Sequence, residues 1–511
     1  MDFLNTWGIT LLTFAPLIVA AAVIAVPKAD EQLQKTIALG GSLGVLALMV
    51  WIMAKFDYSN SGTLQFERNK AWINVINSRY HIGVDGMALP LAALSVLIIP
   101  LCVIYSWNHF PDPHNPKAFL ALMLVLETGM IGTFISQDLI LFFVFFELVL
   151  LPMYFMIGVW GGPNRQYASL KFFLYTMFGS AFMLLGFLAL YFKAGRTFDI
   201  AQLTQNVQSV GLSSGTQKLI FAGLFLGFAI KVPMFPFHTW LPDAHTEAPT
   251  QGSVILAAVL LKLGTYGFIK IAIPILPQGA KAWAPWIGGL AAFGIIYGAL
   301  GCLAQTDFKR LIAFSSVAHM GYVMLGISTL TSYGINAAIF GMVAHGLITG
   351  MLFFCAGSLK ERFHTLEIKR MGGLLKQMPK LGWVLGFATM ASLGLPGLAG
   401  FWGEFPAILS AYQPHESLSV QWFRAFMVVA SVGTVFAAGY LLWLYQRTAF
   451  GTPKAEWDGH VFHDVAPEEW AAWIPMLALI LVLGLFPGLI FKITDGSVQN
   501  LVSHVSQSLG R

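Results

Sequence analysis

Long apolar stretches recur from one end of this chain to the other, and they constrain its fold more than any other feature. Of the 511 residues, 57% are hydrophobic and only 10% are charged. Apolar runs of about 20 residues have the length that an α-helix needs to cross the hydrocarbon core of a bilayer, whereas barrel strands would alternate apolar and polar side chains. The sequence therefore predicts an all-α polytopic membrane protein.

Fourteen membrane-spanning helices can be placed along the chain. The predicted spans cover residues 7–26, 35–54, 87–106, 118–136, 138–158, 167–192, 215–236, 250–275, 283–303, 310–329, 334–358, 381–410, 422–446 and 470–491. The first run has no basic segment and no small-residue cleavage site, so we interpret it as a retained helix and not as a signal peptide. The polar stretch at 193–214 has helical spacing of its apolar residues, which predicts a helix along the membrane surface.

Positive charges favour one set of alternate loops. These loops are 27–34, 107–117, 159–166, 304–309, 359–380 and 447–469. By the positive-inside rule they are predicted to be cytoplasmic, with both termini on the outer side. The net charge of +5 is scattered, without a basic block interleaved with aromatic residues, so nucleic acid is not expected as a partner.

Two of the predicted spans are interrupted. In IKVPMFPFHTWLPDAHTEAP, Lys231 ends an apolar run just before Pro233 and Pro236, and in LGLPGLAGFWGE, Pro396 and several glycines precede Glu404. Backbone groups freed by such breaks persist in a membrane only against protein or a water-filled cavity. The breaks fall in the seventh and twelfth spans, which predicts two inverted five-helix repeats, spans 4–8 and 9–13, with an ion path between them.

This pattern divides the chain into four predicted parts. Residues 1–117 contain the first three helices, 118–275 the first repeat, 276–446 the second repeat, and 447–511 a loop and the last span.

Seven ionisable side chains lie within predicted spans and not in loops. They are Glu127, Glu147, Lys231, Lys262, His319, His345 and Glu404. An ionised side chain at the bilayer centre costs about 2.5–3.5 kcal/mol even on a lenient scale, so such residues are functional by default. Burial in general brings the pKa values of lysine and glutamate toward neutrality, and an opposite charge reverses that shift. A Glu147–Lys231 pair that opens and closes could therefore load and unload a lysine proton, with histidines as intermediate carriers.

Some of these side chains also have other interpretations. Glu127 could simply hydrogen-bond a neighbouring helix, and His238 and His245, in the polar turn after Pro236, are expected to be satisfied loop residues. A haem between His319 and His345 is disfavoured, because quinol-oxidising cytochromes usually carry two stacked histidine pairs.

The three cysteines lie far apart in apolar runs, which predicts no disulfide, zinc site or iron–sulfur cluster.

Four segments resemble the antiporter-like subunits of respiratory complex I, the proton-translocating NADH:quinone oxidoreductase. They are SQDLILFFVFFELVLLPMYFMIGVWGG, KVPMFPFHTWLPDAHTEAPTQGSVILAAVLLKLGTYG, DFKRLIAFSSVAHMGYVMLG and LPGLAGFWGEF. The resemblance covers spans 3 to 13. Within this family the chain is most similar to the bacterial M branch, because it stops soon after the last span without the long lateral helix of subunit L, and it carries Glu404 where subunits L and N usually have lysine.

The resemblance implies a proton relay of six residues. They are Glu147, Lys231, Lys262, His319, His345 and Glu404. In this relay Glu147 would partner Lys231, Lys262 would be the central carrier, and the two histidines would bridge to Glu404 as the outer site. Glu127 has no place in it.

The resemblance also implies the setting of the chain. NAD, FMN, iron–sulfur clusters and quinone would be held by partner subunits, and this chain would hold no cofactor or metal. Its neighbours would be other membrane-arm subunits, especially L and N, and lipids, in the inner (plasma) membrane of a bacterium. Multisubunit Na+/H+ antiporters and membrane-bound hydrogenases share the fold and stay open as alternatives.

Overall fold

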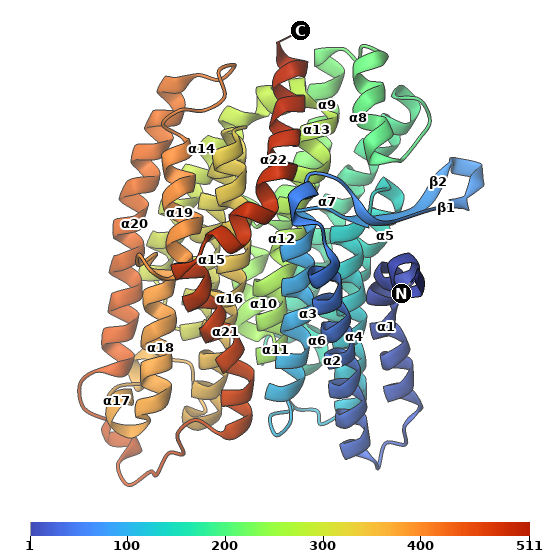
Figure 1. Cartoon of the computed structure of the whole chain (residues 1–511). Helices are drawn as coiled ribbons and strands as arrows, with labels where there is room; N and C mark the ends of the chain where they lie inside the picture. Colours follow the sequence, from blue (N-terminus) through green and yellow to red (C-terminus); the bar gives the residue numbers. More distant parts are fainter. Residues whose placement is uncertain (1, 511) are drawn as a thin grey trace.

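A computed structural model describes residues 2–510 of the chain. Most of the molecule is a bundle of long helices whose axes are roughly aligned with one another (Figure 1). Twelve helices in this range are long and apolar enough to cross a membrane. The predicted all-α membrane class is therefore confirmed. The two remaining predicted spans are the interrupted ones, so the count of fourteen and the division into two repeats stay predictions.

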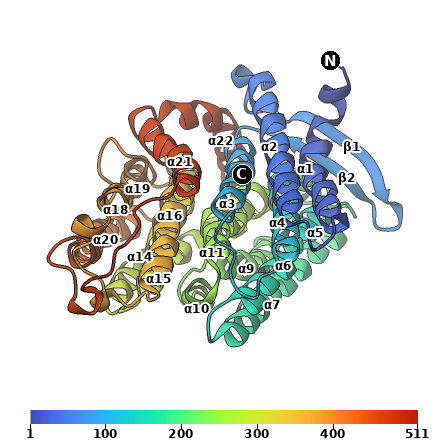
Figure 2. The ribbon, with the colours of Figure 1, turned by 90° about the horizontal axis from the view of Figure 1, so that it is seen from below.

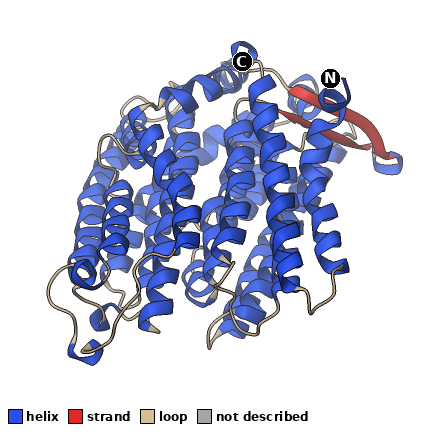
Figure 3. Cartoon of the chain, turned by 60° about the horizontal axis from the view of Figure 1, so that its bottom comes forward, coloured by secondary structure: helices blue, strands red, loops and turns tan. Residues whose placement is uncertain are grey.

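One β-hairpin departs from the all-α prediction (Figure 3). The first helices are α1 (Asp2–Ala25), α2 (Glu31–Lys55) and α3 (Ala88–Tyr105). Between α2 and α3 lie a 3₁₀ turn (η1, Tyr58–Asn60) and the strands β1 (Gln65–Ile73) and β2 (Ser78–Val84), which are joined by a second 3₁₀ turn (η2, Asn74–Ile76). The strands are antiparallel, with Gln65 opposite Val84 and Ile73 opposite Ser78. The hairpin occupies the long polar piece between the second and third spans.

The next helices form the first half of the bundle. They are α4 (Pro116–Ile135), α5 (Leu139–Leu148), α6 (Leu150–Trp160), α7 (Arg165–Lys193) and α8 (Ile200–Ser209). Helices α5 and α6 make one span that is divided at Val149, just after Glu147. Helix α8 has the amphipathic character that the sequence predicts.

The first predicted break follows. Helix α9 (Ser214–Lys231) ends at the lysine, and after a turn the chain forms the short helix α10 (Trp240–Glu247). The next span consists of α11 (Thr250–Ile255), α12 (Leu261–Gly267) and α13 (Ile273–Ile275), joined by π-helical segments at Leu256–Leu260 and Phe268–Ala272. Such π segments loosen the regular helical hydrogen bonding and are frequent at functional sites.

The second half contains the second break. Its elements are α14 (Pro277–Leu303), α15 (Phe308–Ser328), α16 (Ser332–Phe363), η5 (Ile368–Arg370), α17 (Leu374–Gln377), α18 (Pro379–Ser392), α19 (Ala399–Ser410) and α20 (Val420–Ala449). Between α18 and α19, Gly394 and Gly397 have φ angles of +74° and +94°, in the left-handed region that favours glycine. The glycines therefore permit the turn that interrupts this span.

The chain ends in a feature that the sequence analysis did not predict. After η6 (Ala455–Trp457), helix α21 (Pro467–Leu485) is followed at once by α22 (Gly488–Leu509), which runs to the C-terminal end (Figure 1). The predicted last span, 470–491, therefore corresponds to α21 and the beginning of a second helix.

The interior of the bundle is formed by three spans. In the apolar stretches of α15 and of the α11–α13 span, 94% of the residues are buried, and in that of α16 all of them are. Seen along the bundle, α11 and α16 lie between an N-terminal and a C-terminal group of helices (Figure 2). Side chains on these spans face other helices and not lipid.

Candidate functional site

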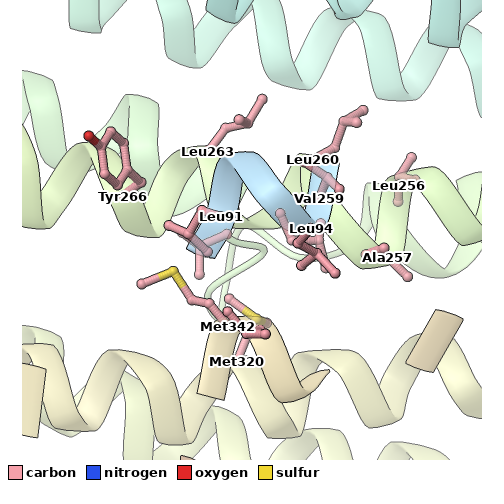
Figure 4. Packing of buried hydrophobic residues seen from close by; sticks show 14 of the residues in the cluster. Leu91, Leu94, Leu256, Ala257, Val259, Leu260, Leu263, Tyr266, Met320 and Met342 are labelled. Atoms are coloured by element: carbon pink, nitrogen blue, oxygen red, sulfur yellow. The ribbon is translucent and has the colours of Figure 1, made fainter. Parts of the chain in front are cut away.

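Lys262 lies at the centre of the bundle on α12, between the two π-helical segments. The side chain is fully buried, and its Nζ lies 2.7 Å from Nδ1 of His345 on α16. Lys262 Nζ also donates to the carbonyl oxygen of Ala257, which lies in the first π segment. Leucines of α3 and α12 and methionines of α15 and α16 pack around this stretch, so the lysine is held in an apolar setting (Figure 4).

The contact between Lys262 and His345 restricts where their protons can be. An ammonium has three donors and no acceptor, so a charged Lys262 requires Nδ1 of His345 to be unprotonated. A neutral lysine amine could instead accept a proton from Nδ1. The two groups are therefore in position to pass one proton directly between them.

The next residue in the arrangement after His345 is His319 on α15. Their ring centroids are 6.0 Å apart, and Nε2 of His345 has no hydrogen-bond partner in the described part of the chain. His319 Nδ1 lies 2.5 Å from Oε1 of Glu404 on α19, and its Nε2 lies 3.2 Å from both the Ser392 and the Tyr440 hydroxyls. Four of the six predicted residues thus form one row across four helices.

A small cavity lies beside this row. Its space open to the centre of a water molecule is about 20 Å³, which is room for one water. His319, His345, Ser392 and Glu404 line it together with small and apolar residues. A water there would connect Nε2 of His345 with the Glu404 carboxylate or His319.

Glycines bring Glu404 into the row. A Cβ built on Gly403 would lie 2.5 Å from the Cα of Gly341, so α19 and α16 contact each other backbone to backbone. Glu404 follows directly in sequence. The break before α19 and this close approach together place the carboxylate against His319.

Glu147 and Lys231 lie apart from each other. The Glu147 carboxylate accepts a hydrogen bond from the Ser180 hydroxyl on α7, and Lys231 Nζ lies 4.7 Å from the centroid of the Phe146 ring. No ion pair within 4.0 Å joins the two charges, and Lys231 Nζ has no hydrogen-bond partner among residues 2–510. The hypothesised pair is therefore open in this conformation.

Lys231 nevertheless adjoins the central helix. A Cβ on Gly264, two residues after Lys262, would lie 3.1 Å from the Cβ of Lys231. The end of α9 and the helix that carries the central lysine are thus in direct contact.

The expectation that His238 and His245 are satisfied loop residues is wrong for His245, which lies on a helix, whereas His238 lies in the turn before α10 as expected but is not satisfied at Nδ1 by any described residue. His245 is fully buried on α10, stacks on Phe353 at 4.4 Å between ring centroids, and has no partner for either ring nitrogen within the described residues. Nδ1 of His238 is also unpaired there. The signal was available: Trp240, Leu241 and Ala244 share one helical face with His245, so the segment is an amphipathic helix and not a polar turn.

A polar vestibule begins at the end of the helix that carries His245, where Glu247 and Ala248 line it. Lys309 Nζ donates to the carbonyl of Ala248 at 2.5 Å. Lys309 and Ala248 line this vestibule of about 710 Å³, together with Glu361, which is 3.1 Å from His109 Nε2. The vestibule opens beside loops of the Lys/Arg-rich set.

Glu127 stays outside this arrangement. It is fully buried on α4, and neither carboxylate oxygen has a partner in the described residues. The hydrogen bond to a neighbouring helix that the sequence suggested is therefore not formed. Within residues 2–510, no group of three or more His, Cys, Asp or Glu side chains could hold a metal ion.

Comparison with known proteins gives consistent matches along the whole chain. Residues 136–437 match the family described as "NADH:quinone oxidoreductase/Mrp antiporter, TM", and residues 14–133 match "NADH-ubiquinone oxidoreductase chain 4, amino terminus". NADH-quinone oxidoreductase subunit M of Rhodobacter capsulatus is 41% identical over an alignment of 517 positions, which covers 98% of each chain. NADH-ubiquinone oxidoreductase chain 4 of Arabidopsis thaliana is 38% identical, over 96% of each chain.

Solved structures show the same likeness. A chain of respiratory complex I from Thermus thermophilus with bound NADH superimposes with a TM-score of 0.86 at 28% identity, over 97% of this chain and 99% of that one. A chain of the Mrp complex from Dietzia sp. DQ12-45-1b gives a TM-score of 0.84 at 20% identity, over 98% and 99%. The second match is a likeness of fold alone.

Proposed function

This chain belongs to the NADH-quinone oxidoreductase subunit M family, and from that premise we propose that it moves protons across the membrane through buried Lys, His and Glu side chains while quinone is reduced elsewhere in the assembly. The observation that carries the proposal is the row Lys262–His345–His319–Glu404, in which four titratable residues from four helices meet. A row of titratable side chains without a function would only cost free energy inside a membrane.

The roles within the relay follow from position. Lys262 is the central carrier, His345 and His319 pass its proton on, and Glu404 is the terminal site beside the second helix break. Glu147 and Lys231 form the regulatory pair, because Lys231 adjoins the central helix. When the pair closes, the carboxylate neutralises Lys231; when it opens, the uncompensated charge of Lys231 disfavours a proton on Lys262.

Such coupling is needed on energetic grounds. Moving one charge against 100 mV costs about 2.3 kcal/mol, so each transfer must be linked to an electrostatic change driven from outside the subunit. In this proposal His245 and the polar vestibule form the inlet, because the vestibule opens beside the Lys/Arg-rich loops and the helix that carries His245 ends at it. By the positive-inside rule that side is cytoplasmic, which makes Glu404 the outward site.

The setting belongs to the proposal as well. The neighbours of the chain are the other membrane-arm subunits, especially L and N, in the inner membrane of a bacterium. NAD, FMN, iron–sulfur clusters and quinone are bound by partner subunits. This chain contributes proton movement and no electron transfer.

The test compares two lysines of one helix. Lys231→Ala removes the regulatory lysine, whereas Lys218→Ala removes an exposed lysine near the start of α9. In the purified assembly reconstituted in liposomes, quinone reduction and proton uptake are measured together. We expect Lys231→Ala and Glu147→Gln to lower proton uptake about tenfold or more, the rate change for a barrier higher by about 1.4 kcal/mol, and Lys218→Ala to leave it unchanged. Wild-type uptake by both relay variants would disprove the proposal.

A further inference from the structure

The open Glu147–Lys231 pair is held by two other side chains. Ser180 on α7 bonds the Glu147 carboxylate, and the Phe146 ring lies beneath Lys231 Nζ at 4.7 Å. Lys231 is only 2% exposed, so water does not replace its contact with Phe146, and Glu147 is partly buried. Each member of the pair thus has an alternative partner within the protein.

Close packing of α7 on α9 puts Ser180 in this position. A Cβ built on Gly179 would lie 3.3 Å from the Cα of Gly227 and 3.3 Å from the Cβ of Ile230. Ile230 directly precedes Lys231. Ser180, the next residue after Gly179, therefore lies at the level where α9 ends and reaches across to α5.

The hydrogen bonds of Ser180 leave a choice for its single proton. The hydroxyl is within bonding distance of Glu147 Oε1 and, at 2.9 Å, of the Thr176 carbonyl oxygen. A hydroxyl has one donor and can also accept. If the donor points to Glu147, Oε1 accepts, as an ionised carboxylate does; if it points to Thr176, the contact with Glu147 requires a protonated carboxyl that donates to Ser180.

We propose that Ser180 is a positioning residue that holds Glu147 in both protonation states, and that Phe146 holds Lys231 while the pair is open. When a carboxylate oxygen of Glu147 takes up a proton, the new O–H donates to Ser180 Oγ and the Ser180 hydroxyl turns to the Thr176 carbonyl. When the carboxyl releases that proton, the hydroxyl turns back. The pair can then open without leaving either group unpartnered. This inference rests on the proposed function.

Hydroxyl removal tests the role of Ser180. Ser180→Ala is compared with Ser180→Thr, which keeps the hydroxyl, and with Ser169→Ala, which removes another buried hydroxyl of α7 that lies outside the relay. All three are measured in the assembled complex for proton uptake and for the infrared C=O band that Glu147→Gln abolishes. We expect Ser180→Ala to lower uptake about tenfold, as for one charge-assisted hydrogen bond, and to shift the band.

The conservative variant should restore what the alanine variant loses. Ser180→Thr should show the wild-type band position and most of the uptake, and Ser169→Ala should match the wild type in both. If Ser180→Ala has the band and uptake of Ser169→Ala, the role of Ser180 is disproved. If Glu147→Gln itself pumps normally, the proposed function fails instead.

Phe146 is tested by a second matched pair. Phe146→Leu keeps an apolar side chain but removes the ring face that a cation prefers, and Phe119→Leu makes the same change at a buried site on α4 beside Trp160. Phe146→Leu should lower proton uptake several-fold at unchanged assembly, while Phe119→Leu should not. Equal effects of the two variants would show that the ring of Phe146 acts through packing alone.

Discussion

At the scale of single residues, the proposed relay depends on keeping a lysine titratable in an apolar interior. Lys262 has two polar contacts, a backbone carbonyl and the Nδ1 atom of His345. A fixed charge there would be costly, because a buried ion needs a partner of opposite sign. When Lys262 passes its proton to His345, the lysine becomes neutral and this cost is removed.

This leads to a prediction that separates charge from titration. Lys262→Arg keeps a positive charge, but a guanidinium stays protonated in proteins and cannot act as a carrier. We expect Lys262→Arg to assemble and yet to pump at about one tenth of the wild-type rate or less, the loss expected when one transfer step is blocked. Proton uptake per quinone reduced is the measurement, and Lys218→Arg, on the exposed face of α9, is the control. Wild-type pumping by Lys262→Arg would show that only the charge matters.

The residues of the central row could be singled out from the sequence because charge is rare in apolar runs. Lys262, His319, His345 and Glu404 stand out on that ground, and the structure brings them into one row. The separation of Glu147 from Lys231 could not be predicted, because it depends on side-chain partners from other helices. His245 was missed because flanking prolines and acids give its helix the composition of a loop.

At the scale of elements, local sequence signals predicted some features and not others. The breaks after Lys231 and before Glu404 follow from prolines and glycines, which act locally. The π segments around Lys262 have no such local signature in the sequence. The hairpin was missed because β1 is largely exposed and lacks a clear apolar alternation.

The hairpin carries an ionic clamp that depends on pH. Nδ1 of His81 lies 2.6 Å from Asp199, which precedes α8, and Nε2 lies 2.8 Å from Glu67 of β1. Burial alone would lower the pKa of His81, but the hydrogen bonds and charges of Asp199 and Glu67 outweigh it and raise the pKa. Burial likewise opposes the effect of His81 and the backbone on Asp199, whose pKa is nevertheless lowered. With a carboxylate at each ring nitrogen, the imidazolium form donates both bonds.

The sign of the pH dependence follows from these shifts. The stabilisation from His81 is complete below its unfolded pKa of about 6.5 and is lost as the pH rises through the raised folded pKa. That from Asp199 is complete above its unfolded pKa of about 3.9 and is lost as the pH falls through the lowered folded pKa. We expect hydrogen exchange of residues 65–84, corrected for the intrinsic rate, to be slowest between about pH 4 and 6.5 and to accelerate at alkaline pH. His81→Gln should abolish the alkaline acceleration, and its persistence would contradict the clamp.

At the scale of the whole molecule, the row from Lys262 to Glu404 crosses between the two groups of helices. Lys262 belongs to the first half, whereas His345, His319 and Glu404 belong to the second. The proposed proton transfer therefore requires that the halves keep their packing. The order of spans predicts two halves, but it does not predict what joins them, because the joining contacts are hydrogen bonds between residues far apart in the sequence.

Helix α22 contacts both halves and the segment before the hairpin. On the first half, His504 Nε2 lies 3.1 Å from the carbonyl oxygen of Pro274 on α13. Ser497 donates to the Ser61 carbonyl at 2.6 Å, and Asn500 donates to the carbonyl of Gly62 at 3.1 Å, at the base of the hairpin. On the other half, Thr494 bonds Asn336 of α16 at 2.6 Å, and Asn336 in turn donates to Asp495 at 2.9 Å. The helix therefore acts as a strap across both halves.

Removal of the strap should loosen the two halves together. Each hydrogen bond contributes about 1 kcal/mol, so deleting residues 488–511 should cost roughly 3–5 kcal/mol of stability, and Asn336→Leu, which breaks only two of the bonds, a smaller part of it. The thermal unfolding temperature of the detergent-purified assembly measures this loss, and a variant lacking only residues 510–511 is the control. Because Lys262 and His345 meet across the halves, proton uptake per quinone should fall with stability in the same order. If the deletion left both quantities at the control value, the halves would be held by apolar packing alone and α22 would not be a strap.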